Sequence, residues 1–246
     1  MVNYWKIVNE VIRRSDIIIL VLDARYIEDT RNKELEDKII RSEKPILYVI
    51  NKCDLVPREE HKYIKSLNPS IYISAKDHLG TANLRKKIMI TAQDVKTEMI
   101  HVGIVGYPNV GKSSIINSLR GRASAKVSNI SGYTKNKQNV RVSKKLILID
   151  TPGVIPYKEK DTDKHALIGT INISKQKNPD LLVIEIIRKN PGIIEEMYGV
   201  KKRKNNALLL EDIAKKKGML LKGGVPDINR ISQMILQDLQ KGTKKK

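Results

Sequence analysis

The fold of this 246-residue chain is decided by the stretch Met99-Ile-His-Val-Gly-Ile-Val-Gly-Tyr-Pro-Asn-Val-Gly-Lys-Ser-Ser114. Its first residues are mostly apolar and predict a buried strand, and the residues that follow, 114–120, predict a helix. Between the two lies the pattern G-x-x-x-x-G-K-S, which begins at Gly106 and ends with the triplet Gly111-Lys-Ser113. Glycines allow the backbone N–H groups to turn toward phosphate oxygens, and the helix N-terminus adds a partial positive charge. The stretch therefore predicts a phosphate-binding loop.

Two side chains of this loop have a direct chemical use in holding a nucleotide. Lys112 supplies a positive charge to the outer phosphates, and the Ser113 hydroxyl can be a ligand of Mg²⁺. The alternative is an ordinary glycine-rich turn, but the strand before the loop and the helix after it favour phosphate binding. The predicted nucleotide-binding residues of this stretch are Asn109, Val110, Gly111, Lys112, Ser113 and Ser114.

The composition combines a strong positive charge with little aromatic surface. The net charge of +20 favours a polyanionic partner such as nucleic acid, although a merely soluble basic protein would share it. Aromatic residues make up 4% of the chain and Phe is absent, so aromatic platforms for RNA bases are not expected. Cys53 is the single cysteine, and the sequence shows neither a signal-peptide pattern nor a long apolar run. We therefore expect a cytoplasmic protein that has no membrane partner.

Short apolar runs alternate with amphipathic segments up to about residue 170, and this alternation predicts an α/β fold. The predicted strands are residues 16–23, 45–50, 70–74, 100–105, 139–142 and 145–149. The predicted helices are residues 3–14, 31–41, 58–66, 80–96 and 114–120, followed in the C-terminal part by 208–220 and 228–239. We therefore expect two domains: a doubly wound, mostly parallel sheet in residues 1–170 and a small all-helical domain in residues 171–246.

Two short patterns that follow predicted strands would contact the base of a nucleotide. In Asn51-Lys52-Cys53-Asp54, the Asp54 carboxylate can accept from both the ring N–H and the exocyclic amino group of guanine, a donor pair that adenine lacks. The apolar stem of Lys52 can lie over the base, and Asn51 would tie this loop to its neighbours. The second pattern, Ser74-Ala75-Lys76, could offer a backbone N–H to the guanine carbonyl. Either pattern alone would more often be a surface loop.

A third pattern, Asp150-x-x-Gly153, has the residue types of a phosphate sensor. Asp150 can hold Mg²⁺ through water, and the Gly153 N–H can contact a terminal phosphate. Thr134, in a basic segment without apolar periodicity, is the best candidate for a second Mg²⁺ ligand. A strand-ending turn would explain Asp150 and Gly153 equally well if they stood alone. Together with the phosphate loop, the patterns are much more specific.

These patterns are the motifs of GTPases, but their order resembles the circularly permuted GTPases of the YlqF/YawG family. Asn51-Lys-Cys-Asp54 and the Ser-Ala-Lys pattern come before the phosphate loop, and Asp23-Ala-Arg25 comes before both. The resemblance is strong over residues 1–170 and weaker through Leu210-Glu-Asp-Ile-Ala214 and Gly223-Gly-Val-Pro-Asp227. It implies binding of GTP and GDP, Mg²⁺ as cofactor, and a role in assembly of the large ribosomal subunit through its rRNA.

The resemblance also bears on hydrolysis. Val154 stands where Ras-type enzymes have a water-orienting glutamine, so catalysis would have to be assisted from elsewhere. Asn109 matches an asparagine that helps to bind K⁺ in similar GTPases, and a cation beside the phosphates could stabilise the developing charge. We therefore expect a slow GTPase that the ribosome or K⁺ activates. The residues expected to take part in catalysis are Lys112, Asn109, Thr134 and Gly153.

Basic clusters in the C-terminal part are the predicted contacts with rRNA. Residues 173–246 hold seventeen Lys and Arg against eight Asp and Glu. The clusters are Lys201-Lys202-Arg203-Lys204 and Lys215-Lys216-Lys217, although either could be a solvated helix face. Loss of the terminal phosphate could reposition this part in a monomeric protein. The alternatives are a GTP-gated RNA-binding scaffold with negligible hydrolysis and, less favoured, a GTPase on an acidic membrane surface.

Overall fold

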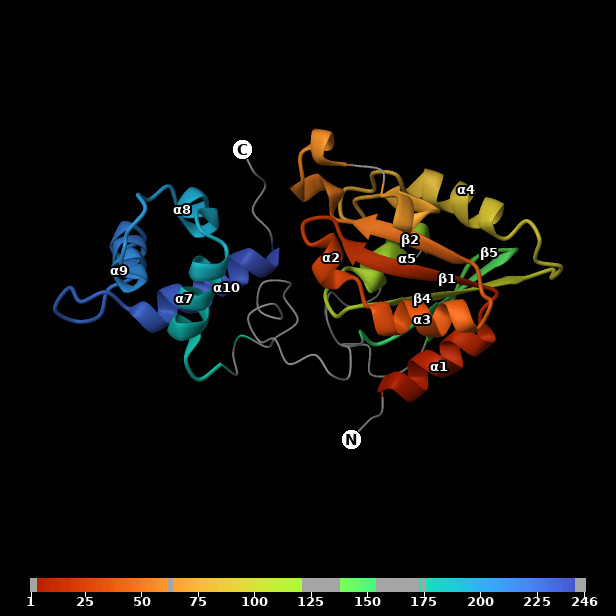
Figure 1. Ribbon diagram of the computed structural model, residues 1–246, viewed down its shortest axis with the longest axis horizontal. Helices are drawn as coiled ribbons and strands as arrows, with labels where there is room; N and C mark the ends of the chain where they lie inside the picture. Colours follow the sequence, from red (N-terminus) through yellow and green to blue (C-terminus); the bar gives the residue numbers. More distant parts are fainter. Residues whose placement is uncertain (1–3, 62–63, 121–137, 154–172, 174–175, 242–246) are drawn as a thin grey trace. The chain divides into compact units, whose positions relative to one another are not determined.

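The computed structural model describes residues 4–61, 64–120, 138–153, 173 and 176–241 (Figure 1). These residues fall into two compact units, one before and one after residues 154–172. The first unit is built on a sheet of six strands in the order β3-β2-β1-β4-β6-β5. The strands are β1 (Ile17–Asp23), β2 (Ile46–Asn51), β3 (Ser70–Tyr72), β4 (Ile100–Gly106), β5 (Gln138–Ser143) and β6 (Leu146–Asp150).

The sheet is parallel except for β5, which runs antiparallel to β6, and the predicted doubly wound, mostly parallel sheet is thereby confirmed. All seven residues of β1 are buried, as its continuous apolar run predicts for a central parallel strand. Helices α1 (Tyr4–Arg14) and α3 (Lys33–Arg41) pack on one face of the sheet. Helices α4 (Thr81–Thr91) and α5 (Lys112–Arg120) contact each other on the other face (Figure 1).

The prediction of a helix at residues 58–66 was wrong. The described residues of this segment form two short 3₁₀ turns, Arg58–Glu60 and Lys65–Leu67. Leu67 alone is buried among the described residues of 58–67, so these residues offer no apolar stripe that could hold a full α-helix against the sheet. A further short helix of this unit, α2 (Ile27–Thr30), follows β1 after three residues.

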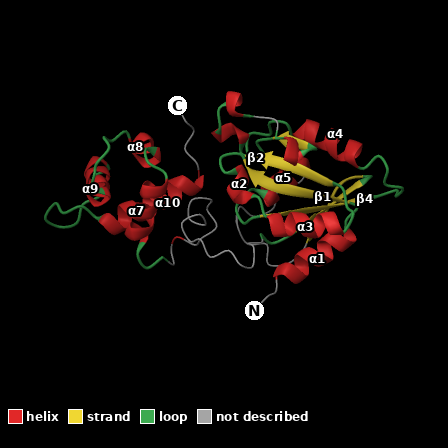
Figure 2. Ribbon diagram, viewed as in Figure 1, coloured by secondary structure: helices red, strands yellow, loops and turns green. Residues whose placement is uncertain are grey.

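The described residues of the second unit are helices and connecting loops (Figure 2). The helices are α7 (Pro179–Lys189), α8 (Ile193–Tyr198), α9 (Asn206–Lys216) and α10 (Ile228–Lys241). Buried residues such as Val183, Ile213 and Ile235 form its core, and α10 packs against both α7 and α9. Asp227 caps α10 by accepting from the N–H of Arg230 at 3.0 Å, as its position before the apolar stripe predicts.

Helix α9 ends four residues before the predicted end at residue 220 because of a glycine. Gly218 takes a left-handed conformation with φ of 65°, and its N–H bonds the carbonyl of Lys215. The N–H of Met219 then bonds the carbonyl of Ala214, which completes the usual glycine-terminated helix end. None of the helices described in either unit is both long and apolar enough to cross a bilayer.

Candidate nucleotide-binding site

The predicted phosphate loop joins the end of β4 to the start of α5. Its backbone has positive φ at Gly106 (146°), Asn109 (60°) and Gly111 (100°), so it turns at three points within six residues. Gly106 also lies against the neighbouring strand, where a Cβ atom would come within 2.6 Å of the Val21 carbonyl oxygen. Both glycines are therefore required by the path of the chain, as the pattern predicts.

Lys112 is buried at the first position of α5. Its ammonium donates to the carbonyl oxygens of Gly106 at 3.2 Å and Tyr107 at 2.6 Å, both in the loop. Burial lowers the pKa of Lys112 to about 8, and the nearby Asp150 carboxylate offsets only part of this effect. The site therefore holds a cation whose charge an anion placed within the loop would stabilise.

This pKa predicts how anion binding should depend on pH. Above about pH 8 the buried Lys112 loses its proton. Nucleotide binding must then return that proton to the ammonium, so the nucleotide affinity should fall by up to about tenfold per pH unit. Burial of the charged Lys112 should also destabilise the nucleotide-free fold, and this destabilisation is complete below about pH 8. It should shrink as pH rises from about 8 to 10.5, because the folded pKa lies below the unfolded value of 10.5. Titration of GDP between about pH 7 and 9 measures the first effect. Lys112→Arg, which stays protonated, should give a flat profile, and a flat wild-type profile would contradict the assignment.

The Asp-x-x-Gly segment follows β6 and lies against the phosphate loop. The Ser113 hydroxyl donates to Asp150 Oδ2 at 3.2 Å, which brings together two of the three predicted Mg²⁺ ligands. Gly153 sits so close to Pro108 that a Cβ atom would lie 2.4 Å from its backbone N and Cα atoms. The third predicted ligand, Thr134, and the Val154 position lie outside the described residues.

Asn51 connects three loops at the ends of the strands. Its side-chain Nδ2 donates to the Val110 carbonyl of the phosphate loop at 2.9 Å, and its Oδ1 accepts from the Ala75 N–H at 3.0 Å. The side chain is buried, so both bonds are sheltered from water. The contact expected between this loop and its neighbours is therefore present.

The Ser-Ala-Lys pattern is placed as expected, but two of its N–H groups have other uses. The Ser74 N–H bonds the carbonyl of Leu79, and the Ala75 N–H bonds Asn51. The predicted donation to a guanine carbonyl would therefore fall to Lys76, which is exposed. The Ser74 hydroxyl accepts from the Asp77 N–H at 3.1 Å and fixes the turn instead.

Asp23, at the end of β1, and Arg25 had no role assigned from the sequence, but both are joined to Lys52 of the Asn-Lys-x-Asp loop through the Asp23 carboxylate. Lys52 has a left-handed backbone with φ of 64°, and its ammonium lies 2.8 Å from Asp23 Oδ2. Arg25 pairs with the same carboxylate at 2.8 Å. Asp54, two residues beyond Lys52, is half-buried. The position of Asp23 at the carboxyl end of a buried parallel strand was the signal that could have identified it.

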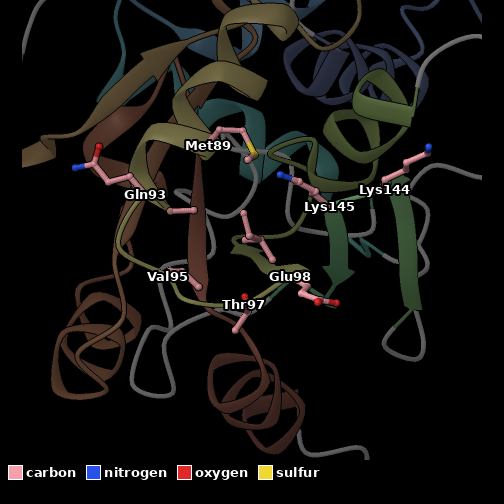
Figure 3. Close-up of a pocket in the computed structure, with 9 residues that line it drawn as sticks. Met89, Gln93, Val95, Thr97, Glu98, Lys144 and Lys145 are labelled. Atoms are coloured by element: carbon pink, nitrogen blue, oxygen red, sulfur yellow. The ribbon is translucent and has the colours of Figure 1, made fainter.

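A separate pocket of about 550 Å³ is lined by none of these residues (Figure 3). It is lined by the end of α4 and the residues that follow, including Met89, Gln93 and Glu98, and by Lys144 and Lys145 between β5 and β6. These residues lie near the start of β4, whereas the phosphate loop follows its end. The pocket is therefore not the candidate nucleotide site.

All seven residues of the predicted RNA-binding clusters are exposed, and four of them also have partners within the second unit. Arg203 Nε lies 2.7 Å from Asp212 Oδ2, and the Lys216 ammonium bonds the carbonyls of Tyr198 at 2.9 Å and Gly199 at 2.7 Å. Lys215 Nζ lies 3.8 Å from Glu211 Oε2, and the Lys217 ammonium lies 5.5 Å from the Tyr198 ring centroid. The other three exposed members of the clusters are Lys201, Lys202 and Lys204.

A phosphate loop, an Asp-x-x-Gly segment and an Asn-Lys-x-Asp loop at one edge of a mostly parallel sheet define a P-loop GTPase fold with permuted motif order. The chain matches the family described as RsgA GTPase over residues 15–158 and that described as 50S ribosome-binding GTPase over residues 101–218. The chain belongs to the circularly permuted GTPases of the RsgA and YlqF/YawG type.

Individual relatives agree with this assignment. An uncharacterized GTP-binding protein of Methanocaldococcus jannaschii is 41% identical over 96% of this chain and 65% of its own length. Nucleolar GTP-binding protein 2 of Saccharomyces cerevisiae is 34% identical over 97% of this chain and 51% of its own. The chain thus spans roughly half to two thirds of these relatives. GNP-bound YlqF of T. maritima, at 22% identity, has the same fold with a TM-score of 0.65 over 97% of this chain and 93% of its own.

Proposed function

We propose that the chain binds GTP and GDP and hydrolyses GTP to GDP and phosphate. The observation that carries this proposal is the pair of bonds made by Asn51, which joins the phosphate loop at Val110 to the Ser-Ala-Lys turn at Ala75. Through this contact, the loops expected to contact phosphate and base form one continuous site. Asp54 supplies the acceptor that selects guanine.

The residues beside the phosphate loop suit Mg²⁺. The Ser113 hydroxyl and the Asp150 carboxylate lie 3.2 Å apart, and both offer the hard oxygen atoms that this ion prefers. Thr134 is proposed as a further ligand. When bound, Mg²⁺ neutralises charge on the outer phosphates. Lys112 adds a second positive charge there, and the Gly153 N–H would contact the terminal phosphate.

Asn109 is proposed to help hold K⁺ at the same phosphates. It is exposed and has a left-handed backbone conformation between the two glycines of the loop. Phosphate release measured in K⁺ and in Na⁺, with and without large ribosomal subunits, tests the hydrolytic proposal. Faster release in K⁺ or with subunits supports an activated GTPase. Tight GTP binding with no release under any condition would instead favour the RNA-binding scaffold.

We further propose that the protein acts in assembly of the large ribosomal subunit by binding its rRNA. Three observations support this role: the match to the family described as 50S ribosome-binding GTPase, the nucleolar relatives, and the exposed lysines of the second unit. Co-sedimentation with large subunits in GDP, in a GTP analogue and without nucleotide tests the proposal. Equal binding in all three states would exclude a nucleotide-gated switch.

The division of the basic clusters predicts which lysines contact RNA. Replacing Lys201, Lys202 and Lys204 by Ala should lower the salt dependence of RNA binding by up to about 2.7 in the log–log slope, since each lost phosphate contact removes about 0.9. The melting temperature should not change, because all three residues are exposed. A filter-binding titration of rRNA over a range of salt concentrations measures the slope.

The matched control replaces three exposed lysines of the first unit, Lys33, Lys86 and Lys96. It removes the same charge from the chain and should leave most of the slope in place. Equal losses from the two triple variants would mean that net charge, and not this cluster, governs binding.

A further inference from the structure

A cluster of buried charges lies at the carboxyl end of β1. The Asp23 side chain is 1% exposed, and Arg25 binds it through two bonds, Nε to Oδ1 at 3.0 Å and Nη2 to Oδ2 at 2.8 Å. Lys52, from the loop after the neighbouring strand β2, adds a third contact, Nζ to Oδ2 at 2.8 Å. One carboxylate therefore holds two cations that come from separate segments.

The backbone fixes the carboxylate independently of Lys52. The Asp23 N–H donates to the hydroxyl of the buried Thr30 at 3.0 Å, and the Arg25 N–H donates to Asp23 Oδ1 at 3.1 Å. The Ala24 N–H bonds the Asn51 carbonyl at 2.8 Å, which joins the end of β1 to the start of the Asn-Lys-x-Asp loop. Asp23 is thus a fixed anchor, and Lys52 is the side chain that it holds.

The stability of the fold does not by itself require the second cation. Arg25 already gives Asp23 a bidentate partner, which is the strongest arrangement for a carboxylate. Lys52 is buried enough that burial lowers its pKa, and its main chain takes a conformation that non-glycine residues rarely adopt. For Asp23, burial acts to raise the pKa, but the Arg25 hydrogen bond and the Lys52 charge outweigh it and lower the pKa. The carboxylate therefore stays ionised.

Asp54, two residues beyond Lys52, relates this cluster of charges to the predicted guanine site. Its negative charge acts to raise the pKa of both Arg25 and Lys52, so Asp54 lies near enough to the cluster to interact with both cations. If the Lys52 ammonium is held at Asp23, its four-carbon stem has a fixed direction next to the carboxylate that is proposed to contact guanine. A free lysine would lose side-chain entropy each time it covered a base, whereas an anchored one has already lost it.

We propose that Asp23 is a positioning residue for the base: it holds Lys52 so that the lysine stem forms a preorganised wall of the guanine site, and Arg25 supports Asp23. This inference rests on the proposed function, because it deepens the same site. It predicts that loss of the anchor should weaken contacts with the base and leave contacts with the phosphates unchanged.

The test compares two ligands on the full chain: GDP, which contacts both parts of the site, and tripolyphosphate, which has no base. Asp23→Asn should weaken GDP binding by about tenfold or more, the effect of having to order one free lysine side chain on binding. Tripolyphosphate, measured by competition with a fluorescent GDP, should bind as it does to the wild type. In the background of Lys52→Met, Asp23→Asn should add little further loss, because the side chain that it holds is already gone.

The matched control is Asp16→Asn, the same change before the other end of β1, where the carboxylate accepts from the His101 N–H at 2.8 Å. It should leave both affinities unchanged. If Asp23→Asn does not fold, Asp23→Glu keeps the charge and shifts the carboxylate by one methylene, and it should weaken GDP alone. Equal losses of GDP and tripolyphosphate, or no loss of either, would overturn the inference. A wild-type chain with no preference for GDP over ADP would instead overturn the proposed function.

Discussion

Asp54→Asn is expected to change the base preference of the chain from guanine to xanthine nucleotides. Guanine presents two donors, the ring N–H and the exocyclic amino group, and the Asp54 carboxylate is proposed to accept from both. Xanthine carries a carbonyl in place of that amino group, so it needs one acceptor and one donor, which an amide supplies. The affinity for GDP should fall by a factor of about 10³ or more, because the mismatch leaves buried polar groups unpaired. Xanthosine diphosphate should gain affinity.

Titrations with GDP, xanthosine diphosphate and ADP measure this change. Glu59→Gln is the matched control, because it makes the same change of charge at an exposed position five residues along the loop. Asp54→Ala removes the acceptor without adding a donor, so it should lose GDP and gain no other base. Wild-type affinity of Asp54→Asn for GDP would mean that Asp54 does not contact the base, and the assignment of guanine would fail with it.

The sequence predicted the parts of the fold in which one physical signal dominates. The continuous apolar runs of β1, β2 and β4 are typical of strands that are covered on both faces, as in a parallel sheet, and these strands lie within one or two residues of their predicted bounds. Helices α7 and α8 were not predicted. The α7 segment is rich in β-branched residues, Val183, Ile184, Ile186 and Ile187, which weakens its helical signal, and its helical state depends on packing against α10.

The candidate site was predictable as a set of loops but not as a set of contacts. Motif spacing places Asn51 near the phosphate loop, yet its bond to Val110 joins residues 59 positions apart. The pairing of Lys52 with Asp23 likewise depends on strand order, because β1 and β2 are neighbours in the sheet. Lys216 shows the opposite case: a residue that appears to be part of a basic patch in the sequence uses its ammonium to hold the end of α8. Charge alone does not separate these roles.

Gly111→Ala is expected to remove nucleotide binding through a steric effect on Asn51. A Cβ atom at position 111 would lie 2.2 Å from Asn51 Nδ2, and the backbone there has φ of 100°. Asn51 is buried and bonded at both ends of its amide, so it can move only by breaking its bonds to Val110 and Ala75. Left-handed strain of about 1–2 kcal/mol adds to about 1–3 kcal/mol for each buried group left unpaired. The free energy of unfolding should fall by at least about 3 kcal/mol, and GDP affinity by at least about a hundredfold.

Gly218→Ala separates the steric effect from the backbone strain. Gly218 also has positive φ, 65°, but a Cβ atom there would meet nothing within 4 Å. This control should lose about 1–2 kcal/mol of stability and keep full nucleotide affinity, because it lies in the second unit. Chemical denaturation and GDP titration on both variants give the two quantities. If Gly111→Ala behaved like Gly218→Ala in both measurements, Asn51 would not be the rigid link between the base and phosphate loops, and the site would have to be described as two independent halves.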